Sequence, residues 1–159
     1  MRIDPARCAF VTLPRWILGT LMLSGIGINF ANVVGRYAFG RALFWAEETM
    51  VFLTIWGVFI GMAAIAYSGD HLTMDLFSQS IRGRWRAALN AAVAVALLAC
   101  CAFVAAQSFQ VVWLFAGAGQ VSVAAGIPKA IPHAALAVGF VLTAAAVVVR
   151  IRAYLSGKF

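Results

Sequence analysis

Residues 49–67 read TMVFLTIWGVFIGMAAIAY, a run of 19 residues without a charged side chain. Roughly 20 mainly apolar residues, when helical, cross the hydrocarbon core of a bilayer. With Glu47 and Glu48 in front of it, the run predicts a transmembrane helix over residues 47–67. The solvent of this part of the chain is therefore lipid.

The rest of the chain has the same composition. Of its 159 residues, 64% are hydrophobic and 11% are charged, whereas about a quarter of the residues in a soluble domain are charged. Three further apolar blocks, over 16–36, 87–115 and 130–150, complete an all-α integral membrane fold with four transmembrane helices. We predict a single membrane domain over residues 1–159, with short loops and no soluble enzyme module.

The lengths of two blocks bear on how they cross the membrane. The first block follows several arginines, as the apolar core of a signal peptide would. It exceeds the roughly 7–15 residues of such a core and lacks an Ala-x-Ala cleavage site, so we predict an uncleaved span. The third block is longer than a core of about 30 Å requires, so we expect that helix to tilt or to project from the membrane.

The basic residues gather at the ends of the apolar blocks rather than in a stripe, which argues against a nucleic-acid partner despite the net charge of +7. If both termini and the connection between the second and third spans share one side, that side carries nine basic residues and the other side three. Because basic loops stay in the cytoplasm, we predict cytoplasmic N- and C-termini. The nine are Arg2, Arg7, Arg15, Arg82, Arg84, Arg86, Arg150, Arg152 and Lys158, and the three are Arg36, Arg41 and Lys129.

The connection between the second and third spans has a helical pattern of its own. Apolar residues recur at spacings of three and four, opposite polar ones, which predicts a short amphipathic segment in the cytoplasmic interface. The apolar residues are Met74, Phe77, Ile81 and Trp85, and the polar ones are Asp75, Ser78 and Arg82. Since Gly83 weakens a helix, an ordinary polar loop is the alternative.

Residues able to carry chemistry are scarce. Ionisable side chains inside a membrane mark ion or substrate paths, and the central part of every predicted span lacks them. His71 and His133 would lie on opposite sides of the bilayer, roughly 30 Å apart, too far to ligate one haem iron. Cys100 and Cys101 are adjacent, and no second pair is present for a thiol oxidoreductase. We therefore expect no catalytic residue, no cofactor, no metal site and no enzyme activity.

Small and amide side chains are instead suited to contacts between helices. Glycines let two backbones approach closely, and amides in lipid need polar partners. We predict two helix-packing or partner-contacting faces from these patterns. The second span contributes Gly57, Gly61 and Ala64, and the first span contributes Gly25, Asn29, Asn32 and Arg36.

The segment from Arg36 to Trp85 resembles the signature of the small permease (Q) subunits of tripartite ATP-independent periplasmic (TRAP) transporters. That signature has an Arg-Tyr-x-Phe-Gly turn, a Trp-x-Glu-Glu helix start, a Trp-x-x-Phe-x-Gly within the second span, then Gly-x-His and an Asp. Here the matching residues are Arg36, Tyr37, Phe39, Gly40, Trp45, Glu47, Glu48, Trp56, Phe59, Gly61, Gly69, His71 and Asp75. Thr49-Met50 departs from the Leu/Ala-Arg often found after the glutamates, and Met74 replaces a more usual valine.

The resemblance implies a function as well as a fold. It implies the small scaffold subunit of a sodium-coupled, binding-protein-dependent secondary importer of an organic acid such as a carboxylate, in the bacterial inner membrane. Its partners would be a large permease subunit, which binds the sodium and carries the solute, and a periplasmic substrate-binding protein. The alternative is a stand-alone, small homodimeric membrane transporter.

The resemblance also implies two groups of site residues, one on each side of the membrane. The periplasmic-side motif comprises Arg36, Trp45, Glu47 and Glu48, and the cytoplasmic-side motif comprises Gly69, His71 and Asp75. Two readings of the glutamates stay open. They are either solvated acids favoured by the helix dipole, or they pair with Arg36 or contact a partner such as the binding protein.

Overall fold

The computed structural model describes residues 5–69 and 84–156. The predicted amphipathic segment lies outside the residues whose side chains are described, and so do His71 and Asp75. The described helices are α1 (Pro5–Arg7), η1 (Cys8–Thr12), α2 (Leu13–Ala38), α3 (Ala46–Ser68), α5 (Arg84–Gly117), α6 (Ala130–Val149) and α7 (Ile151–Ser156). Among them are four helical segments long and apolar enough to cross a membrane, which confirms the predicted all-α, four-span fold class.

The first membrane helix is longer than the predicted 16–36, because α1, η1 and α2 follow one another without a break. The helical segment Cys8–Ala38 has 31 residues, or about 46 Å at 1.5 Å per residue. Its first turns include the π-helix η1, just before Pro14. Proline has no N–H for the usual bond to the preceding turn, which accounts for the wider turn at this place.

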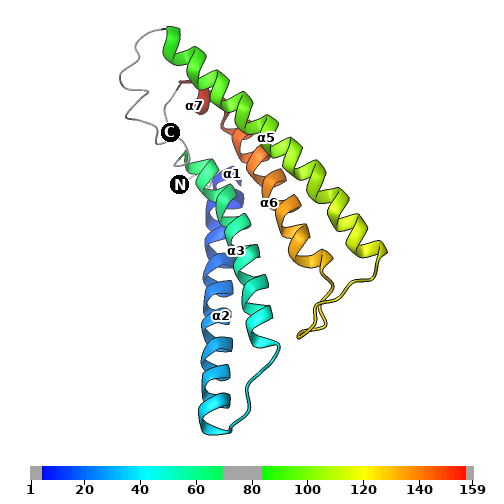
Figure 1. The fold of residues 1–159 in the computed structure, drawn as a ribbon. Coiled ribbons are helices and arrows are strands. Elements are labelled where there is room, and N and C mark those ends of the chain that lie inside the picture. Colours follow the sequence, from blue (N-terminus) through cyan, green and yellow to red (C-terminus); the bar gives the residue numbers. More distant parts are fainter. Residues whose placement is uncertain (1–4, 70–83, 157–159) are drawn as a thin grey trace.

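The membrane helices form an open layer in the order α2, α3, α6, α5 (Figure 1). The main helix pairs in contact are α2 with α3, α3 with α6, and α6 with α5. Helix α6, which contacts both α3 and α5, is the most buried, since 39% of its most apolar part is buried against 6% for the first span. Helices α2 and α5 therefore lie at the two edges, with large apolar surfaces exposed.

The α2–α3 pair and the α5–α6 pair contact each other most closely where α3 crosses α6. Gly139 is buried in α6, and a Cβ atom built on it would lie 2.5 Å from the Cβ of Phe59 and 3.0 Å from its carbonyl oxygen. Beside this contact, the rings of Phe59 and Phe140 pack with centroids 5.9 Å apart. Only a glycine lets the two backbones approach this closely. Position 139 was not among the predicted packing residues.

Most of the buried core lies at the end of the molecule that holds α1 and α7, which we call the inner end (Figure 1). The Tyr154 hydroxyl donates a hydrogen bond of 2.6 Å to the Ala66 carbonyl oxygen. Burial raises the pKa of the Tyr154 phenol, so the hydroxyl keeps its proton and stays a donor. Tyr67 stacks on Phe10 at 5.4 Å, and the Arg150 guanidinium lies 5.1 Å from the centre of the Tyr67 ring. Aromatic and cation–π contacts thus join η1, α3 and the end of α6.

The opposite end, which we call the outer end, holds the α2–α3 connection (39–45) and the α5–α6 connection (118–129). Both ends of the described chain lie at the inner end, as an even number of spans requires. The names follow the charge distribution, which predicts that the inner end faces the cytoplasm.

The close approach of α3 and α6 can be tested by adding one methyl group. We expect Gly139→Ala to destabilise the protein by about 1–3 kcal/mol, because overpacking a tight contact costs this much. The measurement is the apparent melting temperature in detergent, followed by tryptophan fluorescence. Gly27→Ala is the control, since a Cβ on Gly27 meets no atom within 4 Å. Equal melting of Gly139→Ala and wild type would show that the helices do not pack this closely.

The orientation can be tested with single cysteines in a chain that lacks Cys8, Cys100 and Cys101. Val123, at the outer end, is 98% exposed, and Leu155, at the inner end, is 42% exposed. We expect an impermeant maleimide to label Val123→Cys in intact cells and Leu155→Cys only after lysis. Labelling in the reverse order would overturn the charge argument.

Candidate functional site

The outer end is built from two connections, and one polar side chain fixes each of them. Asn32, near the end of α2, is 6% exposed, and its Oδ1 accepts a hydrogen bond of 2.8 Å from the Leu43 N–H. The Arg41 N–H donates to the Gly35 carbonyl at 2.9 Å. A Cβ on Gly35 would lie 2.8 Å from the Arg41 carbonyl oxygen, so the α2–α3 connection needs a glycine there. The predicted amide Asn32 therefore packs inside its own chain.

The first acidic residue of α3, Glu47, forms an ion pair with Arg36. Their nearest atoms are 3.7 Å apart, and both side chains are more than half exposed. Such exposed pairs contribute little to stability. Trp45 lies just before the helix, 43% exposed, and its carbonyl accepts a bond of 2.9 Å from the Thr49 hydroxyl.

The second acidic residue, Glu48, has a different environment. Its Oε2 atom accepts hydrogen bonds from the Ser122 hydroxyl at 2.8 Å, the Ala124 N–H at 3.0 Å and the Ala125 N–H at 2.7 Å. We call this contact the Glu48 anchor. It joins the first turn of α3 to the α5–α6 connection, more than seventy positions further along the chain. Hydrogen bonds to a carboxylate are among the stronger ones in proteins.

The α5–α6 connection is itself ordered by backbone bonds. Val121 and Pro128 form an antiparallel bridge. Within it, the Ser122 N–H donates to the Ile127 carbonyl at 2.8 Å, and the Lys129 N–H donates to the Gln120 carbonyl at 2.9 Å. Gly126 adopts a φ of +66°, a left-handed conformation that glycine accepts without strain. The connection thus has one defined shape.

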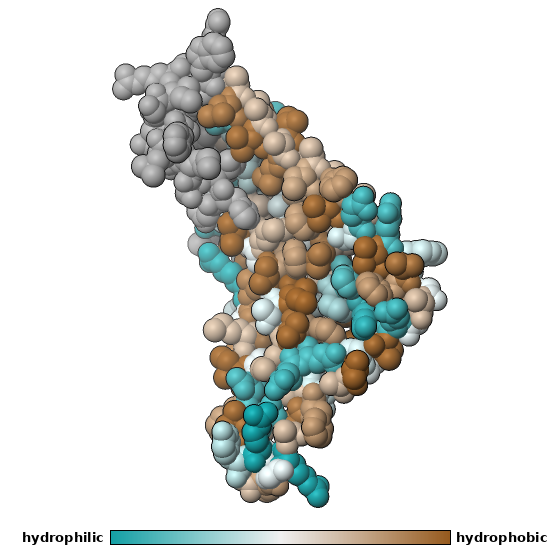
Figure 2. Space-filling model, in the orientation of Figure 1, coloured by the Kyte–Doolittle hydropathy of each residue, from teal (hydrophilic) through white to brown (hydrophobic). Residues whose placement is uncertain are grey.

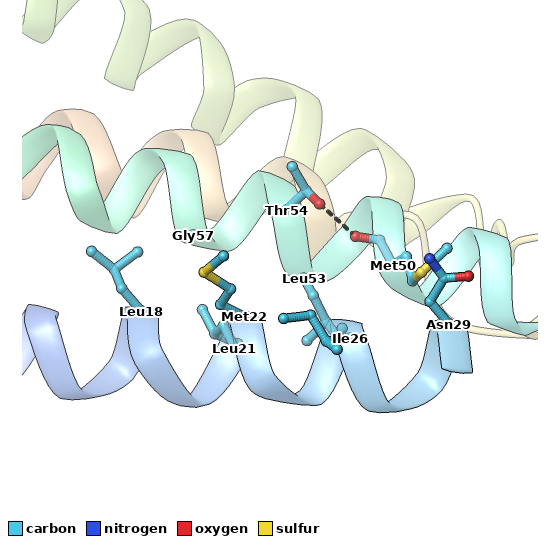
Figure 3. Close-up of a pocket in the computed structure, with 10 residues that line it drawn as sticks. Leu18, Leu21, Met22, Ile26, Asn29, Met50, Leu53, Thr54 and Gly57 are labelled. Carbon is cyan, nitrogen blue, oxygen red and sulfur yellow. Dashed lines mark hydrogen bonds between the residues drawn. The ribbon is translucent and has the colours of Figure 1, made fainter. Parts of the chain in front are cut away.

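A groove runs between α2 and α3 towards the outer end (Figure 3). Its main part has a volume of about 430 Å³, and a more polar pocket of about 200 Å³ that shares Asn29 and Met50 continues it. Leu18, Leu21, Met22 and Ile26 point from α2 towards α3 in this view, and Asn29 lies at the outer end. The lining is mostly apolar, and Met22 and Ile26 are more than half exposed, so the groove is open to the surroundings.

Two of the predicted packing residues of α3, Gly57 and Gly61, face α2 at the inner part of this groove. A Cβ on Gly57 or on Gly61 would be in ordinary contact with the Leu18 side chain, at 3.7 Å and 3.6 Å. Leu18 therefore fills the space beside both glycines from within the same chain. Ala64 is half-buried, and Asn29 is exposed.

Of the cytoplasmic-side motif, only Gly69 is described. It is buried, ends α3 with a φ of +84°, and donates its N–H to the Ile65 carbonyl at 3.0 Å. A left-handed glycine is a common helix end.

The surface combines broad apolar areas on the helices with polar groups at their ends. Figure 2 shows hydrophobic residues along the helices and hydrophilic residues gathered towards the two connections. Within residues 5–69 and 84–156, no group of three or more His, Cys, Asp or Glu side chains is placed to hold a metal ion. The fold and this surface define a multi-pass membrane protein with two open faces.

The comparisons with known proteins identify the class. The family model described as "Tripartite ATP-independent periplasmic transporters, DctQ component" matches residues 25–156, well over half of the chain. The chain therefore belongs to this family, the small permease subunits of TRAP transporters, and the resemblance seen in the sequence is confirmed. The family is a transporter component and not an enzyme family.

One relative is a sialic acid TRAP transporter permease protein, SiaT, of Haemophilus influenzae (strain 86-028NP). It is 25% identical over 88 residues, which are 55% of this chain and 14% of the relative. The match thus covers a small part of a much longer permease protein.

The Glu48 anchor can be tested by hydrogen exchange. We expect Glu48→Ala to speed exchange of the Ala124 and Ala125 amides by about tenfold, because both N–H groups lose their acceptor and the connection opens locally. The measurement is hydrogen–deuterium exchange with mass spectrometry on peptides covering 118–129. Glu47→Ala is the matched control and should leave these peptides unchanged, because Glu47 pairs with Arg36 and not with the connection. If Glu48→Ala exchanged at the wild-type rate, the anchor would not hold the connection.

Proposed function

We propose that this chain is the small scaffold subunit of a TRAP-type importer in the bacterial inner membrane, and that it does not itself carry solute. A sodium gradient would drive the importer, and the solute would be an organic acid such as a carboxylate. The large permease subunit would bind the sodium and the solute, and a periplasmic substrate-binding protein would deliver the solute.

The observation that carries this proposal is the open layer of helices without charge at its centre. Binding an organic acid and sodium within the membrane needs broken helices, oxygen ligands or charged groups near the midplane. Here the central parts of the spans hold no Asp, Glu, Lys, Arg or His, and the four spans are continuous helices. Such a chain is suited to holding another protein rather than to forming a path.

The α2–α3 groove is the face that we propose for the large subunit. Asn29 lies seven residues before Arg36 on α2, which places its amide about 10 Å deeper in the membrane. An exposed amide at this depth needs a polar partner that lipid chains cannot supply. Around it, Met22 and Ile26 offer apolar surface that packs against a helix of the partner. A stand-alone homodimeric transporter would need ion or solute ligands that these spans do not offer.

Reconstitution into vesicles tests the proposal. We expect the purified chain alone to accumulate no solute under a sodium gradient, because its spans hold no ligands for either. Adding the large subunit and a solute-loaded binding protein should restore uptake that depends on external sodium. Gradient-driven uptake by this chain alone would reject the scaffold function and favour the stand-alone transporter.

The same preparation tests the proposed face. Asn29→Leu should lower the yield of the large subunit that copurifies, while the chain alone melts as before because the side chain is exposed. Val95→Leu, at a 66% exposed position on α5, is the control and should copurify normally. Normal copurification of Asn29→Leu, or loss with Val95→Leu, would move the interface away from α2–α3.

A further inference from the structure

We propose that the α5–α6 connection is a preformed docking surface for the soluble substrate-binding protein, through an apolar tip on a connection that also carries the cation Lys129. This inference rests on the proposed function, since it names the surface that one of its partners would contact. The kind of partner follows from three properties of the connection: its order, its exposed tip and the charges beside it.

The order of the connection is the first property. The Val121–Pro128 bridge closes it from within, and the Glu48 anchor fixes it to α3 from outside. The hydroxyl of Ser122, which is 4% exposed, donates to Glu48 and also accepts a bond of 3.3 Å from the Ile127 N–H. A surface that is already ordered binds without the cost of fixing a loop.

The tip is the second property. Val123 is 98% exposed and Val121 is 53% exposed, although the residues between and after them are tied down. A β-branched apolar side chain with almost no contact contributes nothing to the packing of its own chain. The ordered connection therefore presents apolar surface that only another molecule covers.

The position of the tip relative to the membrane favours a soluble partner over lipid chains. The Glu48 carboxylate accepts hydrogen bonds from Ser122 and Ala124, the two neighbours of Val123. The bond from the Ala124 N–H is exposed. A charged carboxylate is costly within hydrocarbon, so this part of the connection lies on the aqueous side. The charge distribution predicts that this side is the periplasm.

The charges are the third property. Both acids of the outer end are engaged within the chain, Glu47 with Arg36 and Glu48 with the connection. Within the described part of the chain, Arg41 and Lys129 at the same end have no ion-pair partner. The outer end thus carries three cations, Arg36, Arg41 and Lys129, against the two acids Glu47 and Glu48, a net charge of +1. This excess favours a partner whose apolar recess is bordered by carboxylates.

Binding of the purified substrate-binding protein to the two-subunit complex in nanodiscs tests the surface. Val123→Asp should weaken binding by about tenfold or more, because a charge enters the apolar contact and meets the partner's acids. Val123→Ile keeps the apolar tip and should bind within about twofold of wild type. Lys129→Gln should slow association at low ionic strength, with a smaller difference at high ionic strength.

Two further variants separate the order of the connection from its tip. Glu48→Gln keeps the Val123 side chain but removes the negative charge of the Glu48 anchor. The connection should then be less ordered, and binding should weaken because the connection has to be ordered on binding. Glu47→Gln should not weaken binding, because it removes an acid and frees Arg36.

Several results would overturn the inference. Wild-type binding by Val123→Asp would show that the tip does not contact the binding protein. Loss of the large subunit from Val123→Asp would place the tip against that subunit instead. If the wild-type complex forms and takes up solute while Val123→Asp and Glu48→Gln bind as wild type does, this inference alone fails. If the wild-type complex does not form, the proposed function fails and this inference fails with it.

Discussion

The contact between Gly139 of α6 and the backbone of Phe59 of α3 determines how the rest of the protein is arranged. Lipid does not drive apolar helices together as water does, so helices in a membrane associate by close packing of small residues. Helix α6 supplies these residues along its buried side, which comprises Pro132, Ala135, Ala137, Gly139, Thr143, Ala146 and Val147. The α2–α3 and α5–α6 hairpins join along this line, and α2 and α5 become the edges of the layer.

The ends of the layer are held by a different kind of interaction. At the inner end, the Tyr154 hydroxyl and the Arg150 guanidinium bind a carbonyl and an aromatic ring of α3. At the outer end, Asn32 and Glu48 each fix one connection by accepting backbone N–H groups. Hydrogen bonds are placed where the chain leaves its helices, because only there are backbone groups without a partner within the helix.

These two features relate the structure to the work of a TRAP small subunit. An open layer has two broad faces, and the apolar and amide side chains of the α2–α3 groove suit contact with a larger membrane protein. The outer end is different in character, because hydrogen bonds order its connections and because Val123 and Val121 are exposed there. Under the proposed function, such a subunit would contact one partner within the membrane and another at the outer end.

The sequence by itself determined the fold class, since the length of an apolar run decides whether a helix can cross the membrane. The run predicted at 47–67 is helix α3 at Ala46–Ser68, and the run at 130–150 is helix α6 at Ala130–Val149. The family signature, read from motifs such as Trp45 and Glu48, is likewise local. These properties depend on neighbours along the chain, and so they can be read from the order of residues.

The tertiary structure alone decided which residues meet. Gly57, Gly61 and Gly139 look alike in a sequence, yet the first two adjoin the flexible Leu18 side chain and only the third touches a backbone. The partner of Glu48 was equally hidden, because two of its three donors are backbone N–H groups of alanines, which carry no signal of their own. Backbone donors exist at nearly every position, and only the path of the chain in space selects the ones that a carboxylate reaches.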